Sequence, residues 1–509
     1  MFTKTNSAID NFLNGITMYR LVLFVLLILL AIAMTLGVFG LVPFSPPAIL
    51  FSALFVTAVS IFTNEIFSRV YNAPLNVESA YITGLVLALI ISPASNLNDY
   101  IFLFWAGVLA MSSKYILAIK NKHIFNPAAI AVVITSIGLG QSASWWVGNA
   151  WMALPVAIGG YLITRKIRRE NMIWNFILTV LSFSIGLGIL KGTGITSTIS
   201  TLILHTSLLF FAGVMLTEPL TSPTTEKWQS IFAVFTGILF LPQIHVGSLY
   251  STPEFALILG NLFAYFVSSK EKLILYLKEK IQISPDSYDF IFPLSKPLKY
   301  KPGQYMEWTL AHPKSDSRGN RRYFTLASSP TENNLRIGIK FYNPASSYKR
   351  AMFLNEKDSY VASQLAGDFV LPSNPNQKCA MLAGGIGVTP FRSMLKYLVD
   401  TKQKRDIVLL FANKHPSEII YNDVFDQAQS ELGIKTIYTV TDTNSVTGGW
   451  TGRVGRIDEQ MIMQEIPDYK ERIFYLSGPR AMVEANENTL KKLGLNKKQI
   501  KTDFFPGFA

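Results

Sequence analysis

Residues 21–42 read LVLFVLLILLAIAMTLGVFGLV, an apolar run whose length decides the fold of the N-terminal half. A helix that crosses the hydrocarbon core of a bilayer, roughly 30 Å thick, needs about 20 mostly apolar residues. The run is too long for the core of a signal peptide, and no small-residue cleavage site follows it. It therefore predicts a transmembrane helix.

Nine further apolar segments follow the first one. They lie near residues 48–67, 79–93, 100–119, 127–140, 149–164, 172–190, 199–217, 228–246 and 255–269. The segments 79–93 and 127–140 are short enough to be half-helices or re-entrant segments, and short segments of this kind are also compatible with buried core helices, so the count can differ from ten by one or two. Residues 1–270 are thus predicted to be a polytopic α-helical membrane domain of about ten helices.

The composition differs between the two halves of the chain. Half of the 509 residues are hydrophobic and 16% are charged, against about 25% charged residues in an average soluble protein. Up to about residue 269 the apolar residues form long runs, and beyond it the sequence reads as an ordinary globular protein. The net charge of +13 is not accompanied by a basic stripe or a nucleic-acid motif, so no nucleic acid is expected as a partner.

The basic residues indicate how the helices cross the lipid bilayer. With the N-terminus inside, the outer loops hold essentially only Lys191. The inner loops hold Arg69, Lys114, Lys120, Lys122, Arg165, Lys166, Arg168, Arg169, Lys227, Lys270 and Lys272. This asymmetry is typical of the cytoplasmic side. We therefore expect a multi-pass protein of the cell (inner) membrane, with the chain beyond residue 270 in the cytoplasm, where nicotinamide cofactors are available.

The cysteine and histidine content predicts organic redox carriers. The single cysteine, Cys379, excludes intramolecular disulfides and cysteine-ligated iron–sulfur clusters. No two of the five histidines share a helix at ligand spacing, which disfavours stacked haems, and we expect no metal site. Cys379 itself is expected to be a buried apolar residue of a strand.

Polar stretches interrupt the inner ends of the apolar segments, at residues 72–79, 124–127, 165–169 and 217–223. Proline and asparagine at such positions are typical of helix termination and capping, and the basic stretch 165–169 is typical of a topology signal. The same stretches would also suit a cofactor or ion site built from broken helices. The sequence leaves both interpretations open.

Several of these motifs resemble one family of membrane proteins. They are ESA at 78–80 followed by TGL at 83–85, FNPA at 125–128, and TEPLTSP at 217–223. The family contains the D-type membrane component of Rnf complexes and the B-type membrane component of the sodium-pumping NADH:quinone reductase. The resemblance covers roughly residues 20–270, and it implies flavin cofactors in the membrane and electron transfer coupled to the bilayer.

The chain departs from this family at the flavin attachment site. Family members attach FMN to the threonine of a Ser-Gly-Ala-Thr motif, which this chain lacks. We therefore expect any FMN or riboflavin in this half to be held by noncovalent contacts. The candidates are the polar inner-side residues Asn76, Glu78, Asn126, Glu218, Thr221 and Ser222.

Short strand-like runs at regular spacing follow between residues 283 and 371. They predict a small antiparallel β-barrel, in a domain of residues 271–375. Within it lies RYFTLAS at 322–328. This motif resembles the flavin motif of the ferredoxin–NADP reductase superfamily, which has an arginine, any residue, an aromatic residue, and serine or threonine. PGQY at 302–305 is another hallmark of that superfamily.

The resemblance implies a role for each residue in an FAD site. The guanidinium fork of Arg322 would bind the pyrophosphate. Phe324, in place of the usual tyrosine, would pack on the isoalloxazine, and the Thr325 hydroxyl would hydrogen-bond flavin N5, where the hydride arrives. Ser346 and Ser347 lie where the superfamily places a second pyrophosphate-binding turn.

From about residue 376 apolar strand-like runs alternate with helical stretches, which predicts a Rossmann-like α/β domain of residues 376–509 for NAD(P). GGIGVTP at 384–390 follows its first strand and opens a helix. Glycines let the backbone approach a pyrophosphate, and the helix N-terminus stabilises the charge. The stretch resembles the superfamily's nicotinamide loop. The expected binding residues are Gly384, Gly385, Gly387 and Thr389.

A later strand of this domain ends in SGP at 477–479, where the superfamily usually has Cys-Gly-Pro with the cysteine beside the nicotinamide. Ser477 would take the place of the cysteine, next to Gly478 and Pro479. No acid or base is obligatory, because the hydride passes directly between two cofactors. Related reductases end with residues that cover the flavin, which makes Phe508 a candidate.

The cofactor preference is predicted from the end of the second strand. A 2′-phosphate normally requires a cationic grip there. Residues 413–415 read NKH, with one lysine and no arginine. This favours NADH over NADPH.

Together these features predict a membrane-bound NAD(P)H oxidoreductase. It would pass a hydride from NAD(P)H to FAD, and then electrons to a membrane flavin, a quinone or an extracellular acceptor. Because the hydrocarbon core is about 30 Å thick, electrons cannot cross it from a cytoplasmic FAD without intermediate carriers. Two alternatives stay open, namely a redox-driven or redox-gated ion transporter and a membrane-anchored flavin reductase.

Overall fold

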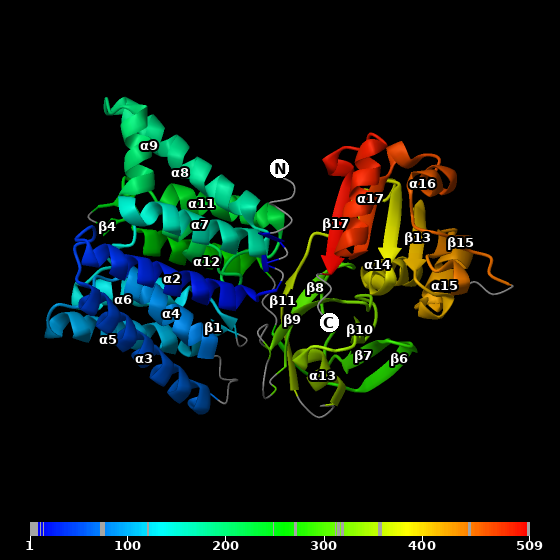
Figure 1. Ribbon diagram of the computed structural model, residues 1–509, viewed down its shortest axis with the longest axis horizontal. Coiled ribbons are helices and arrows are strands. Elements are labelled where there is room, and N and C mark those ends of the chain that lie inside the picture. The colour runs from blue at the N-terminus through cyan, green and yellow to red at the C-terminus, as the bar shows by residue number, and fades with distance from the viewer. Residues whose placement is uncertain are drawn as a thin grey trace. The chain divides into compact units, whose positions relative to one another are not determined.

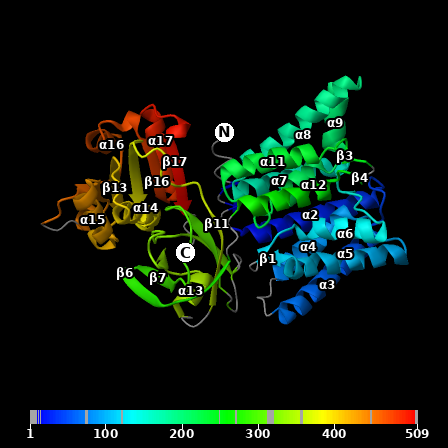
Figure 2. The same ribbon diagram turned by 180° about the vertical axis from the view of Figure 1, so that it is seen from behind.

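The structure is a computed structural model that describes residues 9–10, 12–13, 15–71, 77–119, 122–247, 249–268, 272–310, 312, 316, 320–354, 359–445 and 449–505. The chain divides into two compact units, Met1–Lys272 and Leu273–Ala509. The first unit is helical, and the second contains three sheets with their covering helices (Figures 1 and 2).

Each of the ten apolar segments of the first unit overlaps a helix, or a broken pair of helices, in the structure. The bounds are α2 Met18–Val38, α3 Pro46–Val70, α4 Val77–Ile90, α5 Leu97–Ile116, α6 Pro127–Leu139, α7 Ala150–Ile167, α8 Glu170–Leu190, α9 Ile195–Leu204, α10 Leu208–Phe210 continued by the π-helix η1 Phe211–Met215, α11 Glu226–Leu239 and α12 Pro253–Val267. Two short hairpins pair β1 Ala118–Ile119 with β2 Lys122–His123 and β3 His245–Val246 with β4 Leu249–Tyr250.

By length and composition, fewer of these helices qualify as membrane spans than the sequence predicted. Within the described part of the chain, α2, α3 and α8 are long and apolar enough to cross a bilayer, and the bent pair formed by α9 and 208–215 makes a fourth if it is one span. The helices α4, α6 and α12 are apolar but have only 10–17 residues. The predicted number of about ten spans stays a prediction.

Glycines allow the closest helix contacts of this unit. A Cβ at Gly160 of α7 would lie 3.0 Å from Cα of Gly213 in η1, and one at Gly213 would lie 2.5 Å from Cα of Gly160. A Cβ at Gly84 of α4 would lie 2.6 Å from Cα of Thr57 in α3. Because membrane helices gain stability from close backbone approach, these glycines fix α7 against η1 and α4 against α3.

The second unit begins with two antiparallel sheets. One has the order β10-β7-β6 and the other the order β5-β11-β8-β9. Their strands are β5 Leu273–Tyr276, β6 Glu279–Ser284, β7 Ser287–Pro293, β8 Tyr305–Leu310, β9 Arg321–Thr325, β10 Asn334–Lys340 and β11 Ser359–Ala366, with helix α13 Ser347–Leu354 before β11. The antiparallel strands agree with the sequence. The closed barrel is not confirmed, because the described strands pair as two separate sheets.

Buried and half-exposed side chains alternate along the strands, and the buried ones form the core between these two sheets. On β10 the side chains of Leu335, Ile337 and Ile339 are buried, while the intervening residues are half-exposed. The inner side chains of the other sheet include Trp308, whose ring lies 4.8 Å from that of Phe292 on β7. The two sheets therefore share one apolar core, with Arg322 and Phe324 on a strand at its edge.

The rest of the second unit is a six-stranded parallel sheet of order β15-β14-β13-β12-β16-β17. Its strands are β12 Cys379–Gly384, β13 Ile407–Asn413, β14 Lys435–Val440, β15 Arg453–Val454, β16 Ile473–Pro479 and β17 Ile500–Phe505. Its helices are α14 Thr389–Asp400, α15 Asn422–Leu432, α16 Glu459–Glu465 and α17 Arg480–Lys492. This is the predicted Rossmann-like architecture.

Helices cover both faces of the parallel sheet. Met381 and Ala383 of β12 belong to a core with residues of α14 and α15, and Ala380 and Leu382 belong to a second core with residues of α16 and α17. β12 is therefore buried on both sides, as expected for the central strand of such a sheet. Cys379, the first residue of this strand, is fully buried.

Candidate active site

The glycine-rich loop lies at the carboxyl end of the central strand, as the sequence predicted. β12 ends at Gly384, residues Gly385–Val388 form one 3₁₀ turn, and α14 starts at Thr389. Gly385 has φ of +52°, a left-handed conformation that favours glycine. The loop therefore presents backbone at a helix N-terminus, the arrangement that binds phosphate groups.

The structure brings the SGP turn directly against this loop. Ala383 of β12 pairs with Ser477 of β16, and a Cβ at Gly387 would lie 2.4 Å from Cα of Gly478. A Cβ at Gly384 would lie 3.2 Å from Cδ of Pro479. All of the predicted nicotinamide-site residues from Gly384 to Thr389 and from Ser477 to Pro479 therefore gather at one edge of the sheet.

Two buried polar side chains at this edge fit a bound nucleotide. The Oγ atom of Ser477 is fully buried and makes no hydrogen bond within the described part of the chain. Both polar atoms of the Asn413 amide, at the end of β13, are also buried without a partner there. Buried polar groups nearly always have a hydrogen-bond partner. These atoms could therefore form hydrogen bonds to a nucleotide bound beside the glycine-rich loop.

The predicted pyrophosphate residues meet around one carboxylate. Arg322 of β9 donates from Nη2 to Oδ1 of Asp316 at 3.3 Å, and Oδ2 of Asp316 accepts from the Ser347 backbone N–H at 3.2 Å. Ser347 is the first residue of α13, and the Ser346 hydroxyl accepts from the Lys349 backbone N–H in the same turn. A guanidinium and a helix N-terminus therefore lie together, and both favour an anion.

The aromatic residue of the flavin motif lies against the same helix. The Phe324 ring is 6.1 Å from the Tyr348 ring of α13, and the Arg322 guanidinium is 5.0 Å from that ring. Thr325, the last residue of β9, is nearly fully buried and pairs with Tyr305 of β8. Phe508 lies outside the described residues.

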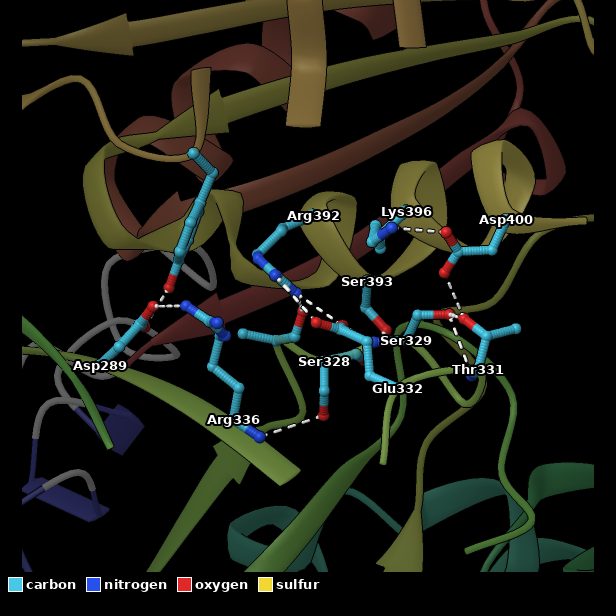
Figure 3. Close-up of polar contacts among 12 residues, drawn as sticks. Asp289, Ser328, Ser329, Thr331, Glu332, Arg336, Arg392, Ser393, Lys396 and Asp400 are labelled. Carbon is cyan, nitrogen blue, oxygen red and sulfur yellow. Dashed lines mark hydrogen bonds and ion pairs between the residues drawn. The ribbon is translucent and has the colours of Figure 1, made fainter. Parts of the chain in front are cut away.

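A polar network links the flavin motif to α14, the helix that directly follows the nicotinamide loop (Figure 3). Arg392 of α14 is only 4% exposed and holds the Glu332 carboxylate with both guanidinium nitrogens, at 2.9 and 3.1 Å. It also donates to the Ala327 carbonyl at 2.7 Å, and the Ser393 hydroxyl donates to the Ser328 carbonyl at 2.5 Å. Residues just after Thr325 are thus bonded to residues just after Thr389.

A second branch of the network crosses the same interface. Asp289 of β7 is fully buried, accepts from the Tyr421 hydroxyl before α15, and pairs with Arg336 of β10 at 2.6 Å. Burial raises the pKa of Asp289 although both partners act to lower it. Tyr421 has φ of +62°, uncommon for a residue with a side chain, and its ring lies 5.3 Å from the Arg392 guanidinium.

The backbone of β10 also approaches the glycine-rich loop. A Cβ at Gly338 would lie 2.6 Å from the Tyr421 hydroxyl oxygen, 2.9 Å from Cγ2 of Thr389 and 3.2 Å from Cδ1 of Ile386. Only a residue without a side chain fits between them. This contact, together with the network, brings the flavin-type sheets and the nicotinamide loop into one site.

The sequence did not identify Arg392, Glu332, Asp289, Arg336 or Tyr421 as site residues. One signal was available, because Arg392 lies between residues that form the apolar face of a helix directly after the loop. A charge at such a position needs a partner. The partner, 60 residues earlier in the chain, has no local signature.

In the first unit, polar residues from distant segments form a membrane polar cluster, defined here as His123, Asn126, Glu218, Thr221 and Asn261. Glu218 accepts from the Asn126 amide at 2.8 Å and from the Thr221 hydroxyl at 3.0 Å, and His123 lies 3.5 Å away. Asn261 of α12 accepts from the Asn126 backbone N–H at 2.8 Å and donates to the Thr221 carbonyl. The cluster therefore joins three of the predicted flavin candidates.

Ser222 adjoins the cluster, because its hydroxyl donates to the Glu218 backbone carbonyl and accepts from Arg169. Glu78 lies elsewhere and pairs with Arg20 of α2 at 3.2 Å. Asn76 lies outside the described residues. Lys114 of α5, which the sequence assigned only to an inner loop, donates to the hydroxyls of Ser79 and Thr83 on α4.

The second unit therefore has the architecture of a two-part reductase, with an antiparallel flavin-type module bonded to a parallel nucleotide-binding sheet. Comparison with protein families agrees with both halves of the chain. Residues 381–488 match the oxidoreductase NAD-binding domain, and residues 143–272 match the NQR2, RnfD, RnfE family. Both matches agree with the predicted combination of a membrane domain and a reductase module, each over part of its half of the chain.

The curated relatives include reductases and flavohemoproteins. The chain is 27% identical over 234 residues to the glycine betaine monooxygenase reductase subunit of Chromohalobacter salexigens, covering 44% of this chain and 62% of the relative. It is 28% identical over 214 residues to the flavohemoprotein of Bacillus subtilis, covering 42% and 53%. With NADH-cytochrome b5 reductase 1 of Aspergillus oryzae it shares 25% identity over 291 residues, covering 55% and 93%. The chain thus spans between half and two thirds of the length of the first two.

Two solved structures also resemble this half. One is the flavohem-like FAD/NAD-binding domain of nitric oxide dioxygenase from Vibrio cholerae, at 22% identity and a TM-score of 0.41, covering 46% of this chain and 98% of that one. The other is the cytochrome b5 reductase domain of Ulva prolifera nitrate reductase, at 23% identity and a TM-score of 0.41, covering 46% and 97%.

Proposed function

We propose that this protein is a membrane-bound NAD(P)H oxidoreductase that passes electrons through FAD to a membrane flavin, a quinone or an extracellular acceptor. The observation that carries the proposal is the network of Figure 3, which bonds the flavin motif to the helix that directly follows the nicotinamide loop. The fusion to a unit of the NQR2, RnfD, RnfE family supports a bilayer-coupled acceptor.

The proposed domains are residues 1–270, 271–375 and 376–509, with the second and third in the cytoplasm. FAD held in this site would supply hydride acceptance from NAD(P)H and one-electron release to the acceptor. The residues of this chain would bind the two cofactors and orient them. Arg322 and the N-terminus of α13 would hold the FAD pyrophosphate, and Gly384, Gly385, Gly387 and Thr389 would hold that of the nicotinamide cofactor.

The remaining site residues act at the reacting centre. Thr325 would donate its hydroxyl to flavin N5, and Phe324 would pack on the ring. Ser477 would contact the nicotinamide with its hydroxyl, which has no hydrogen-bond partner within the described residues. Gly478 and Pro479 would leave room for the nicotinamide beside it. Phe508 would cover the flavin. In the membrane unit, the membrane polar cluster would hold FMN or riboflavin noncovalently, since amides and a carboxylate can bind the edges of a flavin ring.

The test uses the full chain purified in detergent. We expect one FAD per chain, bleaching on addition of NADH under anaerobic conditions, and a second flavin released by denaturation. Under ultraviolet light the denatured protein band should not fluoresce. A fluorescent band would contradict the noncovalent assignment, and a flavin that neither NADH nor NADPH reduces would contradict the proposed function.

A redox-driven ion transporter is the second candidate, and the membrane polar cluster favours it. Asn126, Asn261 and Thr221 are almost fully buried around Glu218, and ionisable groups within a membrane commonly mark ion paths. In sealed vesicles, a transporter would require Na⁺ or H⁺ for turnover and would generate a gradient of that ion with NADH. A membrane-anchored flavin reductase would do neither and would not reduce a lipid-soluble quinone.

A further inference from the structure

Arg392 lies between two segments that must be held at a fixed separation if the proposed function is right. It follows Thr389, which ends the glycine-rich loop, by three residues, and its guanidinium reaches the carbonyl of Ala327, two residues after Thr325. The flavin motif and the nicotinamide loop are thus joined through one buried side chain.

The guanidinium is itself held in one orientation. The two oxygens of Glu332 accept from its two terminal nitrogens, and Oε2 of Glu332 also accepts from the Ser329 backbone N–H at 2.6 Å. Glu332 therefore connects Arg392 to a second backbone position of the flavin segment. A planar fork with paired bonds fixes both distance and angle, which a lysine ammonium cannot do.

The surrounding groups keep this pair charged. Burial acts to raise the pKa of Glu332, but the hydrogen bonds and the charge of Arg392 outweigh it and the pKa is lowered. Arg336 adds positive charge near Glu332, and the Tyr421 ring lies 5.3 Å from the Arg392 guanidinium. The contact therefore persists over the whole neutral pH range.

We propose that Arg392 is a positioning residue for hydride transfer, which uses Glu332 and the Ala327 carbonyl to set the separation of the flavin strand and the nicotinamide loop. This inference rests on the proposed function. Since misplacing reacting groups by about 1 Å can slow a reaction on the order of a hundredfold, loss of the contact should slow the hydride step without weakening either cofactor.

The experiment compares Arg392→Met, Arg392→Lys and Glu332→Gln in the full chain. The matched control is Lys435→Met, which removes an ion pair to Glu465 at a more exposed place on the parallel sheet. Five quantities are measured, namely FAD content, the Kd of NADH, the Tm, the anaerobic rate of flavin bleaching with its deuterium isotope effect, and hydrogen exchange of residues 325–329.

For Arg392→Met we expect FAD content and the Kd of NADH within twofold of the wild type. The bleaching rate should fall at least tenfold, the isotope effect should rise, and residues 325–329 should exchange faster. Arg392→Lys and Glu332→Gln should give smaller decreases of the bleaching rate. If Arg392→Met does not fold, the rates of these two variants test the proposal instead. The control should match the wild type.

Two outcomes would overturn the proposal. An unchanged bleaching rate and isotope effect with a lower Tm would make Arg392 merely structural, and loss of FAD or weaker NADH binding would make it a cofactor-holding residue. If neither nucleotide bleaches the wild-type flavin, the proposed function fails instead. The exchange of residues 325–329 then still reports whether Arg392 holds that segment.

Discussion

Replacing Gly387 with alanine should damage nicotinamide binding through space alone. The φ angle of Gly387 is outside the left-handed region, so alanine can adopt its backbone conformation. The added Cβ would lie 2.4 Å from Cα and 2.6 Å from N of Gly478. Because both neighbours are backbone atoms, the loop and the SGP turn would have to separate by about 1.0 Å, from 2.4 to 3.4 Å, to restore an ordinary contact.

The magnitude follows from that displacement. Overpacking a well-packed site costs roughly 1–3 kcal/mol, and about 1.4 kcal/mol corresponds to a tenfold change in affinity. We expect the Kd of NADH to rise on the order of tenfold, and the Tm of the reductase unit to fall by roughly 2–8 °C. FAD content should not change, because the predicted FAD residues lie on β9 and α13.

The assay is titration of the full chain with NADH under anaerobic conditions, together with flavin absorbance and a thermal scan. Gly186→Ala is the matched control, since a Cβ at Gly186 of α8 meets no atom within 4 Å. A Gly387→Ala protein that binds NADH with wild-type affinity and melts at the wild-type temperature would refute the close approach of the two backbones.

Three further predictions concern other parts of the second unit. Arg322→Ala should lose most of the bound FAD, measured by absorbance after purification, and a full complement of flavin would contradict its role. NADH should be preferred to NADPH in kcat/KM, since Asp442, 3.6 Å from His415, adds negative charge beside the end of β13; a strong preference for NADPH would refute this. Hydrogen bonds from Arg472 lower the pKa of Asp468 to about 2. The ionised Asp468 therefore stabilises the fold above pH 4, and this stabilisation is lost as the pH falls to 2. Asp468→Asn should lower the free energy of unfolding by roughly 1–2 kcal/mol at pH 7 and leave it unchanged near pH 2.

The sequence predicted what is encoded locally. Apolar runs located the helices to within a few residues, and glycine spacing located the loop at Gly384–Gly387, because lipid exposure and backbone conformation depend on adjacent residues. Residues 273–276 and 279–284 form strands in the structure, as the alternation of charged and apolar residues along this stretch allows.

Features that depend on distant pairing escaped prediction. β17 contains Lys501, Thr502 and Asp503 and has no apolar run, yet it pairs along its whole length with β16. Asn126 and Glu218 are 92 residues apart, and their hydrogen bond could not be inferred from either motif. Glu78 carries a motif of the same family but pairs with Arg20, because the neighbours of α4 decide its partner.

The strand order of the parallel sheet has a consequence for how the protein is made. The last strand of the flavin-type sheets ends at residue 366. The central strand of the parallel sheet, at 379–384, pairs with residues 473–479, which are synthesised much later. Domains fold during synthesis from the N-terminus, at roughly 5–20 residues per second. The nicotinamide half of the site is therefore assembled several seconds after the flavin half, and a chain released early from the ribosome, before residue 473, would have a flavin-type module and no partner strand for its glycine-rich loop.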